Sequence, residues 1–221
     1  MTVTTPTILT LLRLLASPAL AVVFMVLPRP LADWVALFLF IGVSATDWID
    51  GYLARAWGQV TRLGTMLDPI ADKAMVTSAL LTLCAVSSLN WAILFPAILI
   101  MFREVFISGL REFLADVAGT LSVTLMAKWK TTAQMVALAV LFAHGIAEHH
   151  AGLSAAGMDP QMVAAVLSGK IVDNGDLGWW IEVARWFGLI GLSLLWIAAV
   201  LTVWTGVDYF RKALPHLKEP E

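Results

Sequence analysis

Long apolar runs fill most of this 221-residue sequence. A helix needs about 20 largely apolar residues to cross a bilayer. Six segments approach that length, at 8–28, 31–52, 69–89, 91–114, 131–147 and 179–205. The chain is 60% hydrophobic and 14% charged, whereas soluble domains are about 45–50% apolar and about 25% charged. The sequence therefore predicts an all-α polytopic membrane protein, with six transmembrane helices in a bundle.

The breaks between these runs are short. Pro28 and Pro30 separate the first two runs, and the residues SSLN at 87–90 separate the third from the fourth. Short connections favour antiparallel neighbours in a bundle. The long hydrophilic break is 148–178, which we expect to be an extracytoplasmic loop insertion with one surface helix at its apolar patch, 162–167. We expect residues 1–221 to form a single domain.

The basic residues predict the orientation. Cytoplasmic loops of membrane proteins carry an excess of Lys and Arg. A cytoplasmic N-terminus puts eleven basic residues inside: Arg13, Arg55, Arg62, Lys73, Arg103, Arg111, Lys128, Lys130, Arg211, Lys212 and Lys218. It leaves three outside: Arg29, Lys170 and Arg185. Both termini are therefore expected in the cytoplasm.

Two aspartates stand at the end of the second apolar run. Asp47 and Asp50 are three residues apart, so on a helix they share a face. Gly51 and Ala54 continue that face with little side-chain bulk. A small, acidic helix end lets a large anionic group approach closely if a cation lies between them.

A second pair has the same pattern. Asp68 and Asp72 are four residues apart, with Gly64 four residues earlier. Four carboxylates close together in a low-dielectric setting require compensating charge. Hard divalent cations such as Mg²⁺ bind carboxylates and substrate phosphates, and a pair of ions can clamp a phosphoryl substitution. Arg55 and Arg62 could hold further phosphate oxygens.

Two other interpretations fit parts of this pattern. The aspartates could be interfacial residues that pair with Arg55, Arg62 and Lys73. They could also line the path of a divalent-cation transporter, although such a path requires carboxylates near mid-membrane, and these lie toward the cytoplasmic helix ends. Two helix faces with the same pattern, each with two aspartates and a glycine, favour the metal site over both alternatives.

The segment DWIDGYLARAWGQVTRLGTMLDPIAD resembles the signature of the CDP-alcohol phosphotransferase family, D-x2-D-G-x2-A-R-x8-G-x3-D-x3-D. Eight positions match over 26 residues: Asp47, Asp50, Gly51, Ala54, Arg55, Gly64, Asp68 and Asp72. The resemblance implies a six-helix membrane enzyme, usually a homodimer. Such enzymes transfer a phosphoryl-bearing group from a CDP-linked donor to an alcohol and release CMP.

The resemblance also implies roles for these residues. Asp47, Asp50 and Asp68 would bind two divalent ions, Mg²⁺ or Mn²⁺. Asp72 would act as the general base and also contact the second ion. The CDP donor would contact a further set, to which Thr10 near the N-terminus is added: Gly51, Ala54, Arg55, Gly64 and Thr10. For Thr10 and Arg13 a structural role fits the sequence equally well.

The acceptor alcohol is not specified by the signature. Arg103 and Arg111 are eight residues apart, about two helical turns. Arg103 lies within an apolar run, where a charge is energetically unfavourable and therefore indicates a functional residue. With Lys128 and Lys130 the two arginines predict a cationic pocket for an acceptor that carries a phosphate. The glutamates that follow the two arginines, Glu104 and Glu112, are expected to point elsewhere. Contacts with lipid headgroups are the alternative for the lysines.

Three patches, TPTILTLLRLLASP, REVFISGLREF and KWKTTAQM, resemble the bacterial family members that join CDP-diacylglycerol to sn-glycerol 3-phosphate. In the implied mechanism Asp72 takes the proton of the glycerol 1-hydroxyl, and that oxygen attacks the β-phosphorus of the donor. Inositol phosphate, serine and phosphatidylglycerol remain alternative acceptors. We expect membrane lipids as partners, no nucleic acid, and a location in the bacterial inner membrane with the active site facing the cytoplasm.

His149 and His150, beside Glu148, could bind a metal on the opposite side of the membrane, but a polar loop explains them more simply.

Overall fold

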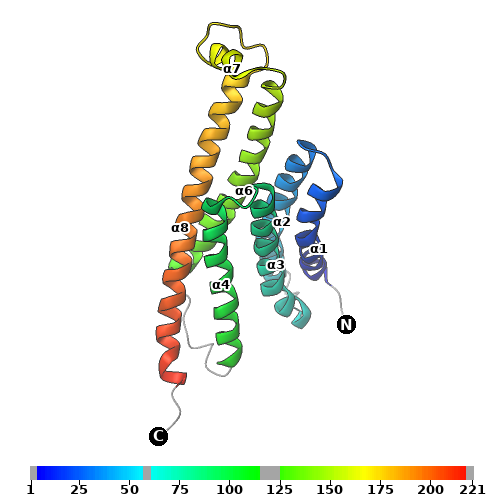
Figure 1. Cartoon of the computed structure of the whole chain (residues 1–221). Coiled ribbons are helices and arrows are strands. Elements are labelled where there is room, and N and C mark those ends of the chain that lie inside the picture. Colours follow the sequence, from blue (N-terminus) through cyan, green and yellow to red (C-terminus); the bar gives the residue numbers. More distant parts are fainter. Residues whose placement is uncertain (1–3, 57–60, 115–124, 218–221) are drawn as a thin grey trace.

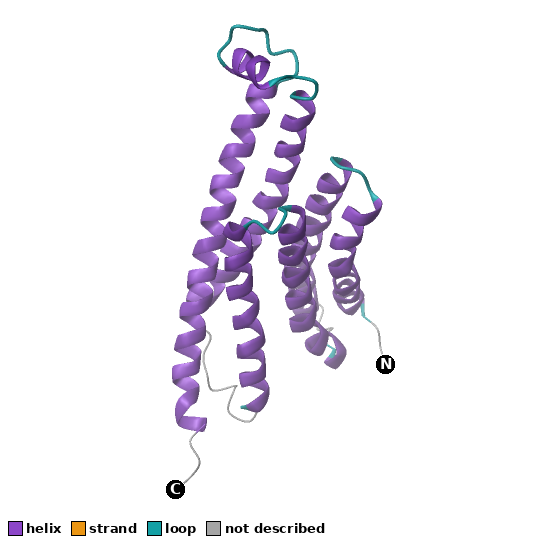
Figure 2. Ribbon diagram, viewed as in Figure 1, coloured by secondary structure: helices purple, strands orange, loops and turns teal. Residues whose placement is uncertain are grey.

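The computed structural model describes residues 4–56, 61–114 and 125–217, without the side chains of 5–6, 47–56, 125 and 127–128. Its elements are α1 (Thr5–Val26), α2 (Leu31–Ala56), α3 (Arg62–Val86), α4 (Trp91–Phe113), α6 (Leu125–Ser154), α7 (Pro160–Leu167) and α8 (Leu177–Leu217). In the described ranges the chain is helical with short connections and contains no strand, which confirms the predicted all-α class (Figure 2).

The helices form two groups that meet at a shared core. The first helix packs against α2 and α3, whereas α8 packs along α6 and against α4 (Figure 1). Contacts of α2 with α6 and of α3 with α4 and α6 join the groups. The chain runs up and down, so that α1 begins and α8 ends at the end of the bundle opposite α7.

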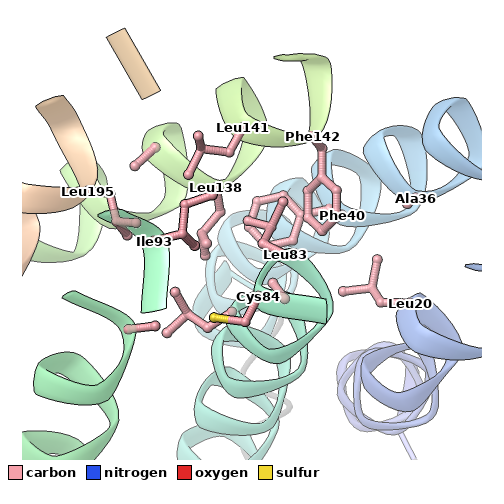
Figure 3. Close-up of a cluster of buried hydrophobic side chains, with 14 of the residues drawn as sticks. Leu20, Ala36, Phe40, Leu83, Cys84, Ile93, Leu138, Leu141, Phe142 and Leu195 are labelled. Atoms are coloured by element: carbon pink, nitrogen blue, oxygen red, sulfur yellow. The ribbon is translucent and has the colours of Figure 1, made fainter. Parts of the chain in front are cut away.

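Apolar side chains from α1, α2, α3, α4, α6 and α8 fill the region where the groups meet. Phe40 on α2 and Phe142 on α6 lie with ring centroids 5.8 Å apart, and both are almost completely buried. Figure 3 shows them beside Leu83, Cys84 and Leu138. Cys84 is a buried free thiol, as expected for a small core residue. This core fixes the position of α3 and α4 relative to α6.

Among the described residues, five helices are long and apolar enough to cross a membrane: Thr7–Val26, Arg62–Val86, Trp91–Phe113, Trp129–Ser154 and Leu177–Leu217. The chain is therefore a multi-pass membrane protein. The second expected span falls on α2, of which Leu31–Thr46 counts as a shorter apolar helix. The count of six spans and the orientation of the termini stay predictions.

Helix boundaries differ from the sequence prediction at polar ends. The third helix begins at Arg62 rather than near 69, α6 continues to Ser154 instead of 147, and α8 extends to Leu217 instead of 205. The additional residues are more polar but still form helix. Hydropathy identifies only the part of a helix that is apolar enough to contact lipid, so the polar ends were not predicted. The prediction that 148–178 is a break was thus wrong for 148–154, whereas the helix predicted at 162–167 is observed as α7.

The connection into α8 is capped by Asp173. Its carboxylate accepts hydrogen bonds from the backbone N–H groups of Gly178 (2.8 Å) and Leu177 (2.9 Å). These bonds stabilise the ionised carboxylate, so the pKa of Asp173 lies below its ordinary value. An aspartate at this position satisfies N–H groups that the first turn of α8 leaves without helical partners.

Close contact between α6 and α8 depends on Gly191. A Cβ atom there would lie 2.8 Å from Cδ2 and 2.9 Å from Cγ of Leu141, which is buried in the core. We expect Gly191→Val to destabilise the protein by about 1–3 kcal/mol, because the two helices must separate or repack. Equilibrium unfolding in mixed detergent micelles measures the effect.

The matched control is Gly152→Val on α6, where a Cβ atom meets nothing within 4 Å. Equal losses of stability in the two variants would show that the change in helix propensity, and not the α6–α8 contact, is responsible.

Candidate active site

Four polar side chains form a buried stripe on α1. Thr7, Thr10, Arg13 and Ser17 are each at most 2% exposed, although most of the helix is apolar. Their spacing of three or four residues places them on one face of the helix. That face lies against α3, which carries Asp68 and Asp72.

At the start of α3, Thr61 is the N-cap residue and its side chain accepts from the N–H of Gly64 at 3.0 Å. Its hydroxyl is also 2.8 Å from the hydroxyl of Thr7. A Cβ atom on Gly64 would lie 3.1 Å from Oγ1 of Thr61, tighter than ordinary contact. The same atom would lie 3.6 Å from Oγ1 of Thr7 on α1, so Gly64 belongs to the α1–α3 contact, which orients the first turns of α3.

The two aspartates of α3 each accept a hydrogen bond from α1. Oγ1 of Thr10 donates to Oδ1 of Asp68 at 2.8 Å, and Nη1 of Arg13 donates to Oδ1 of Asp72 at 2.7 Å. The Arg13 side chain is 2% exposed, whereas that of Asp72 is 53% exposed. The helix pair thus holds two carboxylates in fixed orientations at an accessible surface.

The other half of the expected metal site lies on α2. Asp47, Asp50, Gly51, Ala54 and Arg55 fall in this helix, but their side chains lie outside the described residues. Among the side chains that are described, no group of three or more His, Cys, Asp or Glu could hold a metal ion. Asp68 and Asp72 are hard oxygen donors, which suits Mg²⁺ or Mn²⁺, and the four-aspartate site stays a prediction.

A cavity of about 290 Å³ opens beside Asp72. It is lined by residues of α3, α4 and α6: Pro69, Asp72, Lys73, Val76, Glu104, Arg111, Lys130, Thr131 and Gln134. Three of its side chains are basic and two are acidic. The structure therefore places Arg111 and Lys130 in the same cavity wall as Asp72. Their expected role in binding the acceptor phosphate stays a prediction.

Arg103, which also belongs to the predicted cationic pocket, is not among the described residues that line this cavity. Nη2 of Arg103 is 3.4 Å from Oγ1 of Thr205 on α8, and its aliphatic part lies against Gly206. The side chain of Lys128, the fourth residue of the predicted pocket, lies outside the described residues.

Arg111 also contacts α8. Its guanidinium lies over the Tyr209 ring, 5.2 Å from the centroid. A cation–π contact leaves the guanidinium hydrogen-bond donors available at the edge of the group.

The expectation that Glu104 points elsewhere was wrong. Its Oε1 accepts from Nζ of Lys130 at 2.5 Å and from Nη1 of Arg103 at 3.2 Å, and the side chain lines the cavity. Adjacent residues on a helix point in directions about 100° apart, but two long side chains can still meet at their tips. Which glutamate meets Lys130 depends on how α4 and α6 pack.

Several functional candidates were missed or undervalued in the sequence. Lys73 and Gln134 line the cavity, and Arg13 holds Asp72. The sequence could have indicated the role of Arg13, because a basic residue inside an apolar helix requires an acidic or polar partner. For Lys73 and Gln134 we find no comparable signal, since their role depends on which helices face each other.

His150, near the α7 end of the bundle, makes a structural contact. The His150 ring stacks on Trp180 with centroids 4.4 Å apart. No group of three metal-ligating side chains includes either His149 or His150 in the described part of the chain.

The profile of the CDP-alcohol phosphatidyltransferase family matches residues 3–204. A protein of Cereibacter sphaeroides named CDP-diacylglycerol–glycerol-3-phosphate 3-phosphatidyltransferase is 52% identical over 217 residues, 97% of each chain. Proteins of the same name are 33% identical in Haemophilus influenzae, over 94% of this chain and 92% of the relative, and 35% identical in Escherichia coli, over 94% and 93%.

The contact of Arg13 with Asp72 is expected to stabilise the fold. Arg13→Met keeps much of the side-chain volume but removes the charge partner of Asp72. We expect the free energy of unfolding to fall by about 1–3 kcal/mol, less than for a fully buried pair because water can solvate Asp72. Unfolding in mixed micelles measures the change.

Arg62→Met, at an exposed position on the first turn of α3, is the control and should change stability by at most about 0.5 kcal/mol. A loss at Arg13 no greater than this would contradict a stabilising role.

Proposed function

The chain belongs to the CDP-alcohol phosphatidyltransferase family, and on that premise we propose that it transfers the phosphatidyl group of CDP-diacylglycerol to sn-glycerol 3-phosphate. The products are phosphatidylglycerophosphate and CMP. The names of relatives that cover nearly the whole chain support this activity.

One structural observation supports glycerol 3-phosphate as the acceptor. A single cavity joins Asp72 to the side chains of Lys73, Arg111 and Lys130. An acceptor with a phosphate at one end and a hydroxyl at the other suits a cavity with cations along its wall and a carboxylate at its edge. Serine carries no phosphate, and its single carboxylate is offset by its own ammonium group, so it complements three cations less well.

In the proposed reaction the acceptor hydroxyl oxygen forms a bond to the β-phosphorus of the donor, and the bond from that phosphorus to the oxygen of CMP breaks. Asp72 takes the hydroxyl proton as general base. Arg13 orients the Asp72 carboxylate through its bond to Oδ1, so the base is held at the cavity edge. Thr10 was expected to contact the CDP-linked substrate. It would act through Asp68, whose carboxylate accepts a hydrogen bond from the Thr10 hydroxyl.

The family generally depends on divalent metal ions. We propose that Asp47, Asp50, Asp68 and Asp72 hold two ions, Mg²⁺ or Mn²⁺. When bound, these ions would neutralise charge that develops on the phosphate oxygens during transfer. Asp68 and Asp72 suit this role because α1 fixes their orientation at an accessible surface.

Residues near the α2–α3 connection would bind the nucleotide part of the donor. The proposed contacts are the small residues Gly51, Ala54 and Gly64, which allow close approach, and Arg55, which binds phosphate. The acceptor phosphate would be bound by Arg111, Lys130 and Lys73, with Lys128 near it. Arg103 would contribute through Glu104 and not by direct contact.

We further propose that the protein lies in the bacterial inner membrane as a homodimer of single-domain chains. The active site would face the cytoplasm, where glycerol 3-phosphate is dissolved. The excess of basic residues on the expected cytoplasmic side supports this orientation.

Release of CMP tests the acceptor. Purified protein with CDP-diacylglycerol and Mg²⁺ or Mn²⁺ is expected to release CMP with glycerol 3-phosphate, and to release little with serine, inositol phosphate or phosphatidylglycerol. Chelation of the metal should stop the reaction. Release with another alcohol but not with glycerol 3-phosphate would refute the proposed acceptor, and metal uptake by vesicles without CMP release would favour a transporter.

Replacement of the base should reduce turnover. In Asp72→Asn we expect kcat to fall by about 10²–10⁴-fold, because the amide cannot accept the proton. The control Asp208→Asn breaks only a surface pair with Lys212 and should leave kcat near wild type. Turnover by Asp72→Asn at the wild-type rate would rule out Asp72 as the base.

A further inference from the structure

Glu104 is a carboxylate in the wall of a cavity that we propose binds a phosphate. A negative charge at this place repels the phosphate, so its presence there requires another physical reason. Its side chain is 22% exposed and makes its shortest contact with Lys130, whose side chain is 9% exposed.

The contacts of Glu104 extend to several of the basic residues. Oε1 accepts from Lys130 and from Arg103, and the backbone carbonyl of Glu104 accepts from Oγ of Ser108 at 2.6 Å. Nζ of Lys73 donates to the same Ser108 hydroxyl. Residues of α3, α4 and α6 thus converge on one turn of α4.

Lys130 needs such a partner. A largely buried ammonium is unfavourable without a compensating charge, and the lysine side chain has four rotatable bonds to order. A carboxylate on the facing helix fixes Nζ in one position on the cavity wall. Because an ammonium carries three N–H donors, Lys130 can donate to Glu104 and to a phosphate oxygen at the same time.

We infer that Glu104 is a positioning residue, which holds Lys130 in the cavity wall where it binds the phosphate of the acceptor. This role rests on the proposed function. Glu104 does not itself contact the reacting atoms, and the ordering that it imposes on Lys130 outweighs its repulsion of the phosphate.

The experiment is a double-mutant cycle on the full-length enzyme, read as KM and kcat from CMP release. Glu104→Ala should raise the KM for glycerol 3-phosphate about tenfold, with little change in kcat or in the KM for CDP-diacylglycerol. Glu104→Gln keeps an oxygen acceptor for Lys130 and should raise KM less. In a Lys130→Ala background, the further change Glu104→Ala should have no effect or lower KM, because only the repulsion is then removed.

Glu112→Ala is the matched control, since Glu112 follows Arg111 as Glu104 follows Arg103 but is not among the residues lining the cavity. It should leave all three parameters near wild type. If the alanine variant does not fold, Glu104→Gln replaces it in the cycle, where its rise in KM must likewise disappear in the Lys130→Ala background.

Two results would overturn the positioning role: a KM for glycerol 3-phosphate that falls in Glu104→Ala, or a rise of equal size with and without Lys130. Failure of the proposed function is separate, because it shows already in the wild-type enzyme as absence of CMP release with glycerol 3-phosphate.

Discussion

The bond between Arg13 and Asp72 is the interaction on which the candidate active site depends. Arg13 is buried inside an apolar helix, where a charge is tolerated only beside a compensating charge. Asp72 supplies that charge from α3 and remains half exposed toward the cavity. The same contact therefore docks α1 on α3 and fixes the direction of the carboxylate that we propose as the base.

The long helices contact one another in two different ways. Around Phe40 and Phe142 the contact is apolar, and it positions α3, α4 and α6 without any charge. Near Asp72 the same helices meet through hydrogen bonds and ion pairs, such as Lys130 with Glu104. A packed apolar core resists deformation, so it provides a rigid base for polar groups that must stay accessible to a substrate.

Features that depend on residues close together in the sequence could be predicted. The apolar runs predicted the helices, and the spacing of Asp68 and Asp72 predicted one helical face, because periodicity depends only on neighbours along the chain. Prediction from the sequence was less successful at helix ends such as 148–154, where polar residues continue a helix. It misjudged Glu104, whose contact with Lys130 is between different helices.

The sequence alone determined the all-α membrane class, the family signature and the types of residue available for metal and phosphate. Only the tertiary structure decided that Arg13 pairs with Asp72, that Arg103 lies against α8 and not in the cavity, and that Glu104 meets Lys130. The physical reason is that helix packing sets which faces meet. A rotation of one helix by one residue, about 100°, would replace these partners without changing any local pattern.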